Sequence, residues 1–145
     1  MYFQEITLKN RAGEDVFLLP GDELVEPGIP EHKRVYVGPI GPNGEDVVDP
    51  VKGQAAIFVH LTLIPNWGKL VVGARAGEDS YFDVQQRAYE VVGNAIVNRT
   101  LVSNCEHITS YIRAGKPVSP QLVGAAILVA GGLALALLGQ QSSRR

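Results

Sequence analysis

The sequence predicts an α+β domain, built on a small antiparallel sheet with packed helices, followed by a C-terminal membrane helix. Three observations predict it: short apolar stretches cut by Gly and Pro come first, two helical patterns follow, and an uncharged apolar run comes last. Strands that precede helices are typical of an α+β fold. At 145 residues, 46% of them hydrophobic, the chain is long enough for one domain with a buried core. We expect that domain over residues 1–118, and an anchor with a short tail over residues 119–145.

The first half of the chain carries the strand patterns. Apolar stretches at residues 2–8 and 15–26 are interrupted by Gly and Pro, as in short strands of a twisted sheet. Residues 33–50 predict a β-hairpin, because Val35 to Val37 lead into a Gly/Pro/Asn loop and Val47 and Val48 form the return. Two more apolar stretches, 55–64 and 68–74, predict further strands.

Two helices are expected after the strands. In residues 81–97 Asp83 is placed to cap, Gln86 lies three residues on, and Gly93 is placed to end the helix. Its apolar stripe consists of positions 84, 88, 91 and 92. Ser103 and Glu106 have the spacing of a capping box, so a second helix should begin at residue 104 and stop near residue 115.

The apolar run from Leu122 to Gly139 contains no charged residue. As a helix it would be about 27 Å long, at about 1.5 Å per residue, which is close to the hydrocarbon thickness of a bilayer. A domain of this size has little room to bury a helix that is apolar on all sides. We therefore expect a single-pass anchor, with Arg144 and Arg145 beyond it favouring either a cytosolic tail or contact with anionic headgroups.

The composition indicates the compartment in which the protein works and excludes one class of partner. The net charge of −2 argues against nucleic acid, because binding to phosphates needs a basic surface. The single cysteine suits a reducing compartment, and the N-terminus shows no signal peptide. The scattered histidines offer no convincing metal-ligand cluster, so we expect no metal or other cofactor. These features predict a membrane-associated protein whose domain faces the cytosol.

Cys105 stands in the first turn of the second predicted helix. The free N–H groups and the positive end of the helix dipole stabilise a thiolate at that place, which favours a nucleophile. A cysteine is also often only a small buried side chain, so the position alone leaves both interpretations open.

A nucleophilic cysteine needs a base and a group that orients the base. His107 is two residues from Cys105 and faces another direction on the helix, so packing or hydrogen bonding suits it better. His60 lies within an apolar stretch, where a core histidine is the default. His32 comes after a Gly/Pro loop at the start of a strand, a suitable place for a base that faces a cleft.

At this point the motifs resemble a known family. "NCEH" followed by "ITSYIRAGKPVSPQ", with "PGDELVE" and "EHKRVYVG" before it, is similar to the lecithin:retinol acyltransferase-like family, in particular its phospholipase A/acyltransferase branch. The resemblance covers roughly residues 19–139 in the same order. It implies a permuted papain-like thiol hydrolase/acyltransferase fold.

The resemblance also implies residue roles. Cys105 corresponds to the nucleophile of the NC motif, and His32 to the base of the H-box. The third polar residue of the family, usually a histidine, falls on Asp49, in "VVD"; a shifted strand would instead make it His60. Either could hold the imidazole, as the third member of a triad does.

Lys33 and Arg34 depart from the family, which usually has apolar or aromatic residues beside the H-box histidine. Two cations there would favour a neutral imidazole and an anionic thiolate, and could hold a lipid phosphate. The alternative is a solvated strand edge.

The implied chemistry is acyl transfer through a cysteine thioester, from a glycerophospholipid to water, to the amine of phosphatidylethanolamine or to a lysophospholipid. The partners implied are therefore membrane phospholipids. Two other classes stay open: a catalytically silent relative that binds without chemistry, as the H-box and NC motifs of some small viral proteins suggest, and a membrane-tethering protein in which the anchor dominates.

Overall fold

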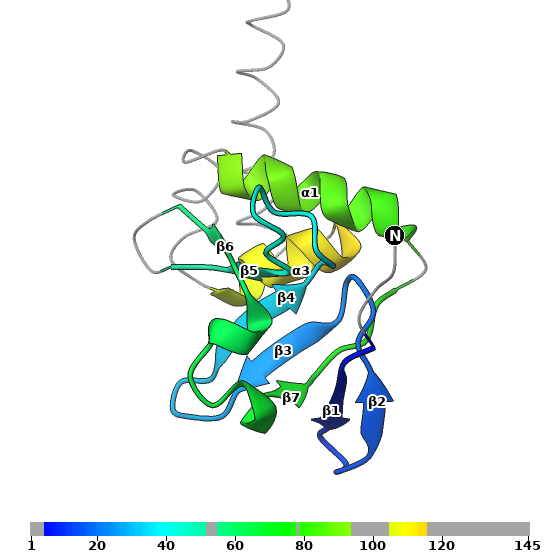
Figure 1. Ribbon diagram of the computed structural model, residues 1–145, viewed down its shortest axis with the longest axis vertical. Helices are drawn as coiled ribbons and strands as arrows, with labels where there is room; N and C mark the ends of the chain where they lie inside the picture. The colour runs from blue at the N-terminus through cyan, green and yellow to red at the C-terminus, as the bar shows by residue number, and fades with distance from the viewer. Residues whose placement is uncertain (1–4, 52–54, 78, 94–104, 116–145) are drawn as a thin grey trace, which may run out of the picture.

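The computed structural model describes residues 5–51, 55–77, 79–93 and 105–115. These residues form a seven-stranded sheet with two helices, α1 and α3, packed together against it (Figure 1). The predicted α+β class is thus confirmed. The strands are β1 Thr7–Asn10, β2 Asp15–Phe17, β3 Glu23–Glu26, β4 His32–Tyr36, β5 Val47–Asp49, β6 Ile57–Val59 and β7 Val71–Val72.

The sheet is mixed, and here the prediction of an antiparallel sheet is wrong. In the strand order β2-β1-β7-β3-β4-β5-β6, β1 and β7 run parallel, with Lys9 opposite Val71. The other pairings between described strands are antiparallel. Hairpin patterns reveal only pairs of strands that are close in sequence, whereas β1 and β7 meet after a long connection, which a parallel pair requires.

The predicted hairpin of residues 33–50 is confirmed. β4 and β5 pair antiparallel, with Val35 opposite Val48 and Tyr36 opposite Val47. In the loop between them the Gly41 N–H donates to the Glu45 carbonyl, and the Gly44 N–H donates to the Gly41 carbonyl. This hairpin matters for function because it places the start of β4 next to the end of β5.

The stretch 55–64 is only partly a strand. After β6 the chain turns into a short 3-10 helix, η1, at Leu61–Leu63. The Asp46 carboxylate accepts the backbone N–H of Leu61 at 2.8 Å, which provides that N–H with a partner outside the sheet. A second 3-10 turn, η2 at Trp67–Lys69, follows before β7.

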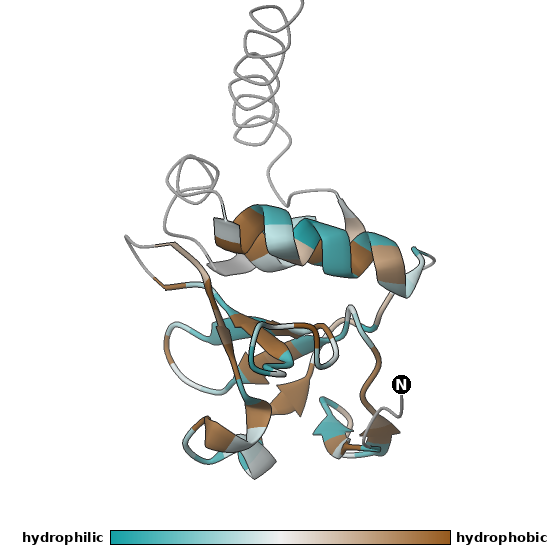
Figure 2. Ribbon diagram, turned by 45° about the horizontal axis from the view of Figure 1, so that its top comes forward, coloured by the Kyte–Doolittle hydropathy of each residue, from teal (hydrophilic) through white to brown (hydrophobic). Residues whose placement is uncertain are grey.

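Hydrophobic residues cover both faces of the sheet, because side chains alternate along each strand. On the side of α1 and α3, Val35, Val37 and Val48 pack against the two helices. On the opposite side, Tyr36 and Val47 pack with η1 and the neighbouring strands. Figure 2 shows this pattern as hydrophobic colour along the strands and as alternating colours along α1. The second core consists of Leu8, Leu18, Leu24, Tyr36, Val47, Leu61, Ile64, Leu70 and Val72.

Helix α1 spans Tyr81–Gly93, and the expected stripe faces the core, with Val84, Ala88 and Val91 buried. The expectation that Asp83 caps this helix is wrong by one turn. Ser80 Oγ accepts the Asp83 N–H and donates to the Asp83 carboxylate, so Ser80 is the N-cap and Asp83 stands at the third helical position. Strand and helix periods do not by themselves fix the first residue of a helix.

Helix α3 spans Cys105–Ala114 and packs on α1 and on β4. The predicted stop is confirmed: Gly115 has φ +65° and donates its N–H to the Tyr111 carbonyl at 2.7 Å. Arg87 of α1 donates to the Ile112 carbonyl, and Arg113 of α3 donates to the Gly21 carbonyl, so each helix is also held by side-chain contacts. Ser103 and Asn104 lie outside the described residues.

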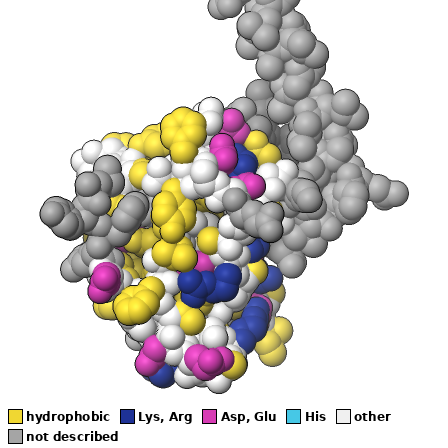
Figure 3. Space-filling view, turned by 90° about the vertical axis from the view of Figure 1, so that its right-hand side faces the viewer, with side chains coloured by type: hydrophobic (Ala, Val, Ile, Leu, Met, Phe, Trp, Pro, Cys, Tyr) yellow, Lys and Arg dark blue, Asp and Glu magenta, His cyan; other side chains and the backbone are white. Residues whose placement is uncertain are grey.

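The surface around β2 and the start of α1 carries large hydrophobic side chains. Phe17 is 61% exposed and Phe82 is 70% exposed. Figure 3 shows this side of the molecule, where hydrophobic side chains lie in separate groups between basic and acidic ones.

The predicted anchor from Leu122 to Gly139, and the division at residues 118 and 119, lie outside the described residues. Within the described ranges, none of the helices has the length and the apolar character that crossing a bilayer requires.

Candidate functional site

The site is built on the β4–β5 hairpin. His32 is the first residue of β4 and Asp49 is the last residue of β5, so the antiparallel pairing brings the two together. His32 Nε2 lies 2.7 Å from Asp49 Oδ1, within hydrogen-bonding distance. The His32 side chain is 33% exposed and that of Asp49 is 18% exposed, so the imidazole is accessible while the carboxylate is mostly enclosed.

The charge state of Asp49 fixes the direction of this bond. Burial acts to raise the pKa of Asp49, but the hydrogen bond with His32 and the charge of Arg34 outweigh it and lower the pKa below its ordinary value of 3.8. Asp49 is therefore ionised at neutral pH and only accepts hydrogen bonds. His32 donates from Nε2, and in the neutral ring Nδ1 is left with the lone pair that can take a proton.

Arg34 joins the same group from two residues further along β4. It is only 8% exposed, its Nε lies 3.1 Å from Asp49 Oδ2, and its Nη1 lies 3.5 Å from Glu26 Oε2. Nε and Nη1 have no aligned hydrogen bond among the described residues, so these two contacts are ion pairs by distance alone. The result is a chain of charged and polar side chains, Glu26–Arg34–Asp49–His32, on one side of the sheet.

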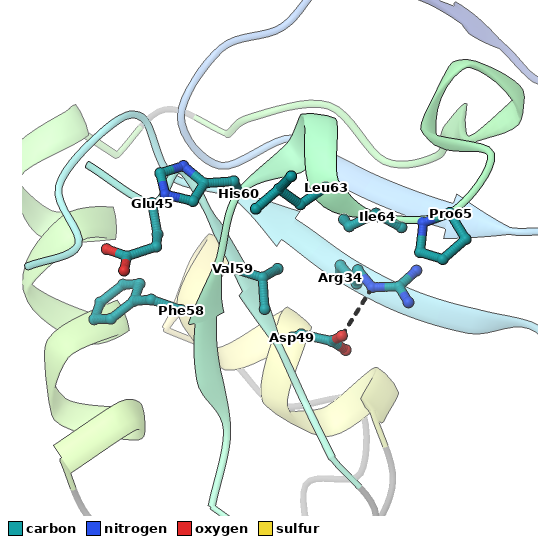
Figure 4. A pocket seen from close by; sticks show the side chains of 9 residues that line it. All are labelled: Arg34, Glu45, Asp49, Phe58, Val59, His60, Leu63, Ile64 and Pro65. Carbon is teal, nitrogen blue, oxygen red and sulfur yellow. Dashed lines mark ion pairs between the residues drawn. The ribbon is translucent and has the colours of Figure 1, made fainter. Parts of the chain in front are cut away.

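A pocket of about 380 Å³ opens beside Arg34 and Asp49. That volume falls within the range of small-molecule sites. Figure 4 shows Asp49 and Arg34 joined by their ion pair, with Ile64 and Pro65 near the guanidinium and Phe58 and Glu45 at the opposite end. The lining consists of Arg34, Glu45, Asp49, Phe58, Val59, His60, Leu63, Ile64 and Pro65, so it is mainly apolar with a few charged groups.

The structure places Asp49, rather than His60, in hydrogen-bonding contact with His32. His60 follows β6 and lines the pocket. Asp49 is thus where the resemblance leads one to expect the orienting residue, and its role in catalysis stays a prediction.

Cys105 is the first residue of α3, which packs on β4 through Ile108 and Ile112. This helix packs on the Val35 side of β4, whereas alternation places His32, like Arg34 and Tyr36, on the opposite side, so the packing of α3 on β4 does not by itself bring the predicted nucleophile to the predicted base. The Cys105 side chain lies outside what the structure describes. His107 is 6% exposed, in keeping with the expected packing role, and its Nδ1 has no hydrogen-bond partner among the described residues.

The two adjacent cations do not share one surface. Alternation along β4 places Lys33 with Val35 on the side of the helices, whereas Arg34 lies with Tyr36 on the opposite side. Two carboxylates already lie beside Arg34, so a lipid phosphate would have to compete with them. Binding by Lys33 and Arg34 stays a prediction.

Sequence reasoning missed the pocket. Its apolar wall is formed by residues on either side of the turn into η1, such as Val59 and Ile64, which a strand prediction over 55–64 would have spread along one strand. The period-two pattern of β4 could have grouped His32 with Arg34, but the Glu26 contact depends on the pairing of β3 with β4.

The described residues contain no group of three histidine, cysteine, aspartate or glutamate side chains arranged to hold a metal ion. No family model, no curated protein and no solved structure matches the chain.

Proposed function

We propose that the chain is a cysteine-dependent phospholipase A/acyltransferase that acts on glycerophospholipid esters through an acyl-cysteine intermediate. The observation that carries the proposal is the His32–Asp49 hydrogen bond of 2.7 Å at the start of β4, the strand whose opposite face packs against α3. A histidine oriented by an ionised carboxylate is the arrangement that activates a thiol. The permuted papain-like form of the α+β fold is part of this proposal.

In the proposed reaction His32 Nδ1 takes the proton of the Cys105 thiol. The thiolate attacks the ester carbonyl, a carbon–sulfur bond forms, and the carbon–oxygen bond to glycerol breaks. The imidazolium returns its proton to the leaving alkoxide, which departs as a lysophospholipid. Water, an amine or a lysophospholipid hydroxyl then attacks the thioester carbonyl, and His32 takes the proton of that nucleophile. The carbon–sulfur bond breaks, the acyl product leaves, and the imidazolium returns its proton to the Cys105 thiolate.

Asp49 supports both halves of this reaction. By accepting the Nε2–H of His32 it leaves Nδ1 as the atom that exchanges the proton, and its negative charge stabilises the imidazolium. The amides at the start of α3 are suitable donors for the oxyanion of the tetrahedral intermediate.

The pocket supports a lipid substrate. Phe58, Val59 and Ile64 give it an apolar wall next to Asp49, which suits an acyl chain whose ester lies near the charged group. The apolar run 122–139 supports the same substrate class, since a tethered enzyme meets membrane lipids at high effective concentration.

The test is intact-mass spectrometry of the full chain in vesicles of phosphatidylcholine. We expect an added acyl mass or released fatty acid with the natural sequence, and neither with Cys105→Ala. His32→Ala should slow adduct formation by about 10²-fold or more, the usual contribution of a general base. His60→Ala is the matched control, a histidine at the pocket that the mechanism does not use.

A blank result with the natural sequence, together with vesicle binding that is the same for Cys105→Ala, would replace this proposal with a silent lipid-binding protein. Loss of the adduct with His60→Ala but not with His32→Ala would reassign the base.

A further inference from the structure

The geometry points to Arg34 as a positioning residue, which holds the Asp49 carboxylate by one oxygen and by its charge makes the His32–Asp49 pair a weaker proton acceptor at rest. The use of this arrangement in catalysis rests on the proposed function. The physical content of the inference, the effect of one buried cation on a neighbouring acid–base pair, can be measured without any turnover.

The backbone decides that Arg34 meets Asp49. His32 and Arg34 are two residues apart on β4, so their side chains leave the same face of the sheet. Asp49 extends the neighbouring strand β5 to that level, where Oδ1 meets His32 and Oδ2 meets Arg34. With both oxygens occupied by different partners, the carboxylate has little freedom to turn away from the imidazole.

Burial makes the contact effective. The Arg34 side chain is 10% exposed and the Asp49 side chain 18%, so solvent screens their interaction less than that of a surface pair. Nη1 of the same guanidinium reaches Glu26 on β3. A guanidinium can face two carboxylates at once because its nitrogens point in different directions, which a lysine ammonium on a flexible stem does less well.

The charges around Asp49 come from several elements. His32 and Arg34 lie on β4, Glu26 faces Arg34 from β3, and Glu45 and His60 line the pocket beside Asp49. Among the described residues Arg34 is the cation that contacts Asp49 besides His32. The positive charge of Arg34 therefore offsets part of the negative charge on Asp49. Arg34 acts at Oδ2, the oxygen that His32 does not contact.

The consequence for the proposed reaction follows from coupled titration. A carboxylate beside an imidazole stabilises the imidazolium, and this raises the affinity of the pair for a proton. A cation beside the carboxylate oxygen that the imidazole does not contact reduces that stabilisation. Arg34 thus lets the pair release its proton at lower pH, so that His32 is free to accept the proton of a thiol.

The experiment follows the three histidines of the full chain, labelled with nitrogen-15, by NMR in detergent micelles from about pH 4 to pH 9. It uses the Cys105→Ala background, in which no thiolate competes for the proton, and His32→Ala assigns the signal. Arg34→Met should move the midpoint of the His32–Asp49 pair to higher pH. Arg34→Lys should restore at least part of the shift.

Lys33→Met is the matched control, because it removes the same charge one residue away on the opposite face of β4. We expect it to move the midpoint less than Arg34→Met does. Should the methionine variant not fold, Arg34→Gln keeps a polar side chain beside both carboxylates without the charge, and it should show the same upward shift.

An unmoved midpoint in the folded neutral variant, or an equal shift with Lys33→Met, would overturn the inference. In the catalytic chain, the acidic limb of kcat/KM should move to higher pH with Arg34→Met, a change that loss of packing alone would not produce. A chain without acyl transfer whose midpoint still responds to Arg34 would defeat the proposed function and leave the role of Arg34 intact.

Discussion

His32 and Asp49 are joined by a 2.7 Å hydrogen bond between the first residue of β4 and the last residue of β5. The two strands belong to one hairpin, so their register brings the imidazole and the carboxylate close together.

Replacing Asp49 by Asn should reduce acyl release by roughly 10²-fold or more, because the amide cannot stabilise an imidazolium. The measurement is the initial rate of fatty-acid release by the full chain from phosphatidylcholine vesicles. Asp15→Asn is the control, since Asp15 pairs with Lys9 on the surface and its side chain is 66% exposed. Equal rates for the two variants would remove Asp49 from the mechanism.

Asp49 should also make stability depend on pH. Its pKa is lower in the folded chain than the ordinary value of 3.8, so the stabilisation is complete above that value and is lost as the pH falls through the folded pKa. The urea midpoint of the natural chain should exceed that of Asp49→Asn at pH 7, and the difference should shrink below about pH 4. A difference of constant size down to about pH 2.5 would contradict this cause.

Filling the pocket should select against long acyl chains. Val59→Trp adds a large ring to the apolar wall beside Asp49, so we expect KM to rise for long-chain esters and to change little for short soluble ones. The control is Phe17→Trp, on β2, which lies outside the pocket lining and is 61% exposed. If both tryptophans act alike on both ester classes, the pocket is not the acyl site.

The cap of α1 should contribute measurably to stability. Ser80→Ala removes the acceptor of the Asp83 N–H and should lower the free energy of unfolding by about 1 kcal/mol. Ser80→Asp keeps an acceptor at the N-cap and should retain most of that stability. Urea denaturation of the three chains measures the difference, and equal stability of Ala and Asp at this position would show that the cap contributes nothing.

Local patterns were sufficient where neighbours in sequence are also neighbours in space. The hairpin of β4 and β5 follows from its valines and its Gly/Pro/Asn loop, the buried stripe of α1 from its apolar spacing, and the end of α3 from Gly115. The expected cap at Asp83 was wrong because Ser80, just outside the apolar pattern, offers the better-placed oxygen.

The sequence by itself determined the α+β class, the hairpin that carries His32 and Asp49, and a helix that contains Cys105 and stops at Gly115, since these depend on side-chain periodicity and turn chemistry. Only the tertiary structure decided that β1 runs parallel to β7, that η1 forms a pocket, and that Arg34 shares Asp49 with His32. The physical reason is that strand order, the packing of a turn against a sheet and the pairing of buried charges depend on contacts between distant residues, which no local pattern records.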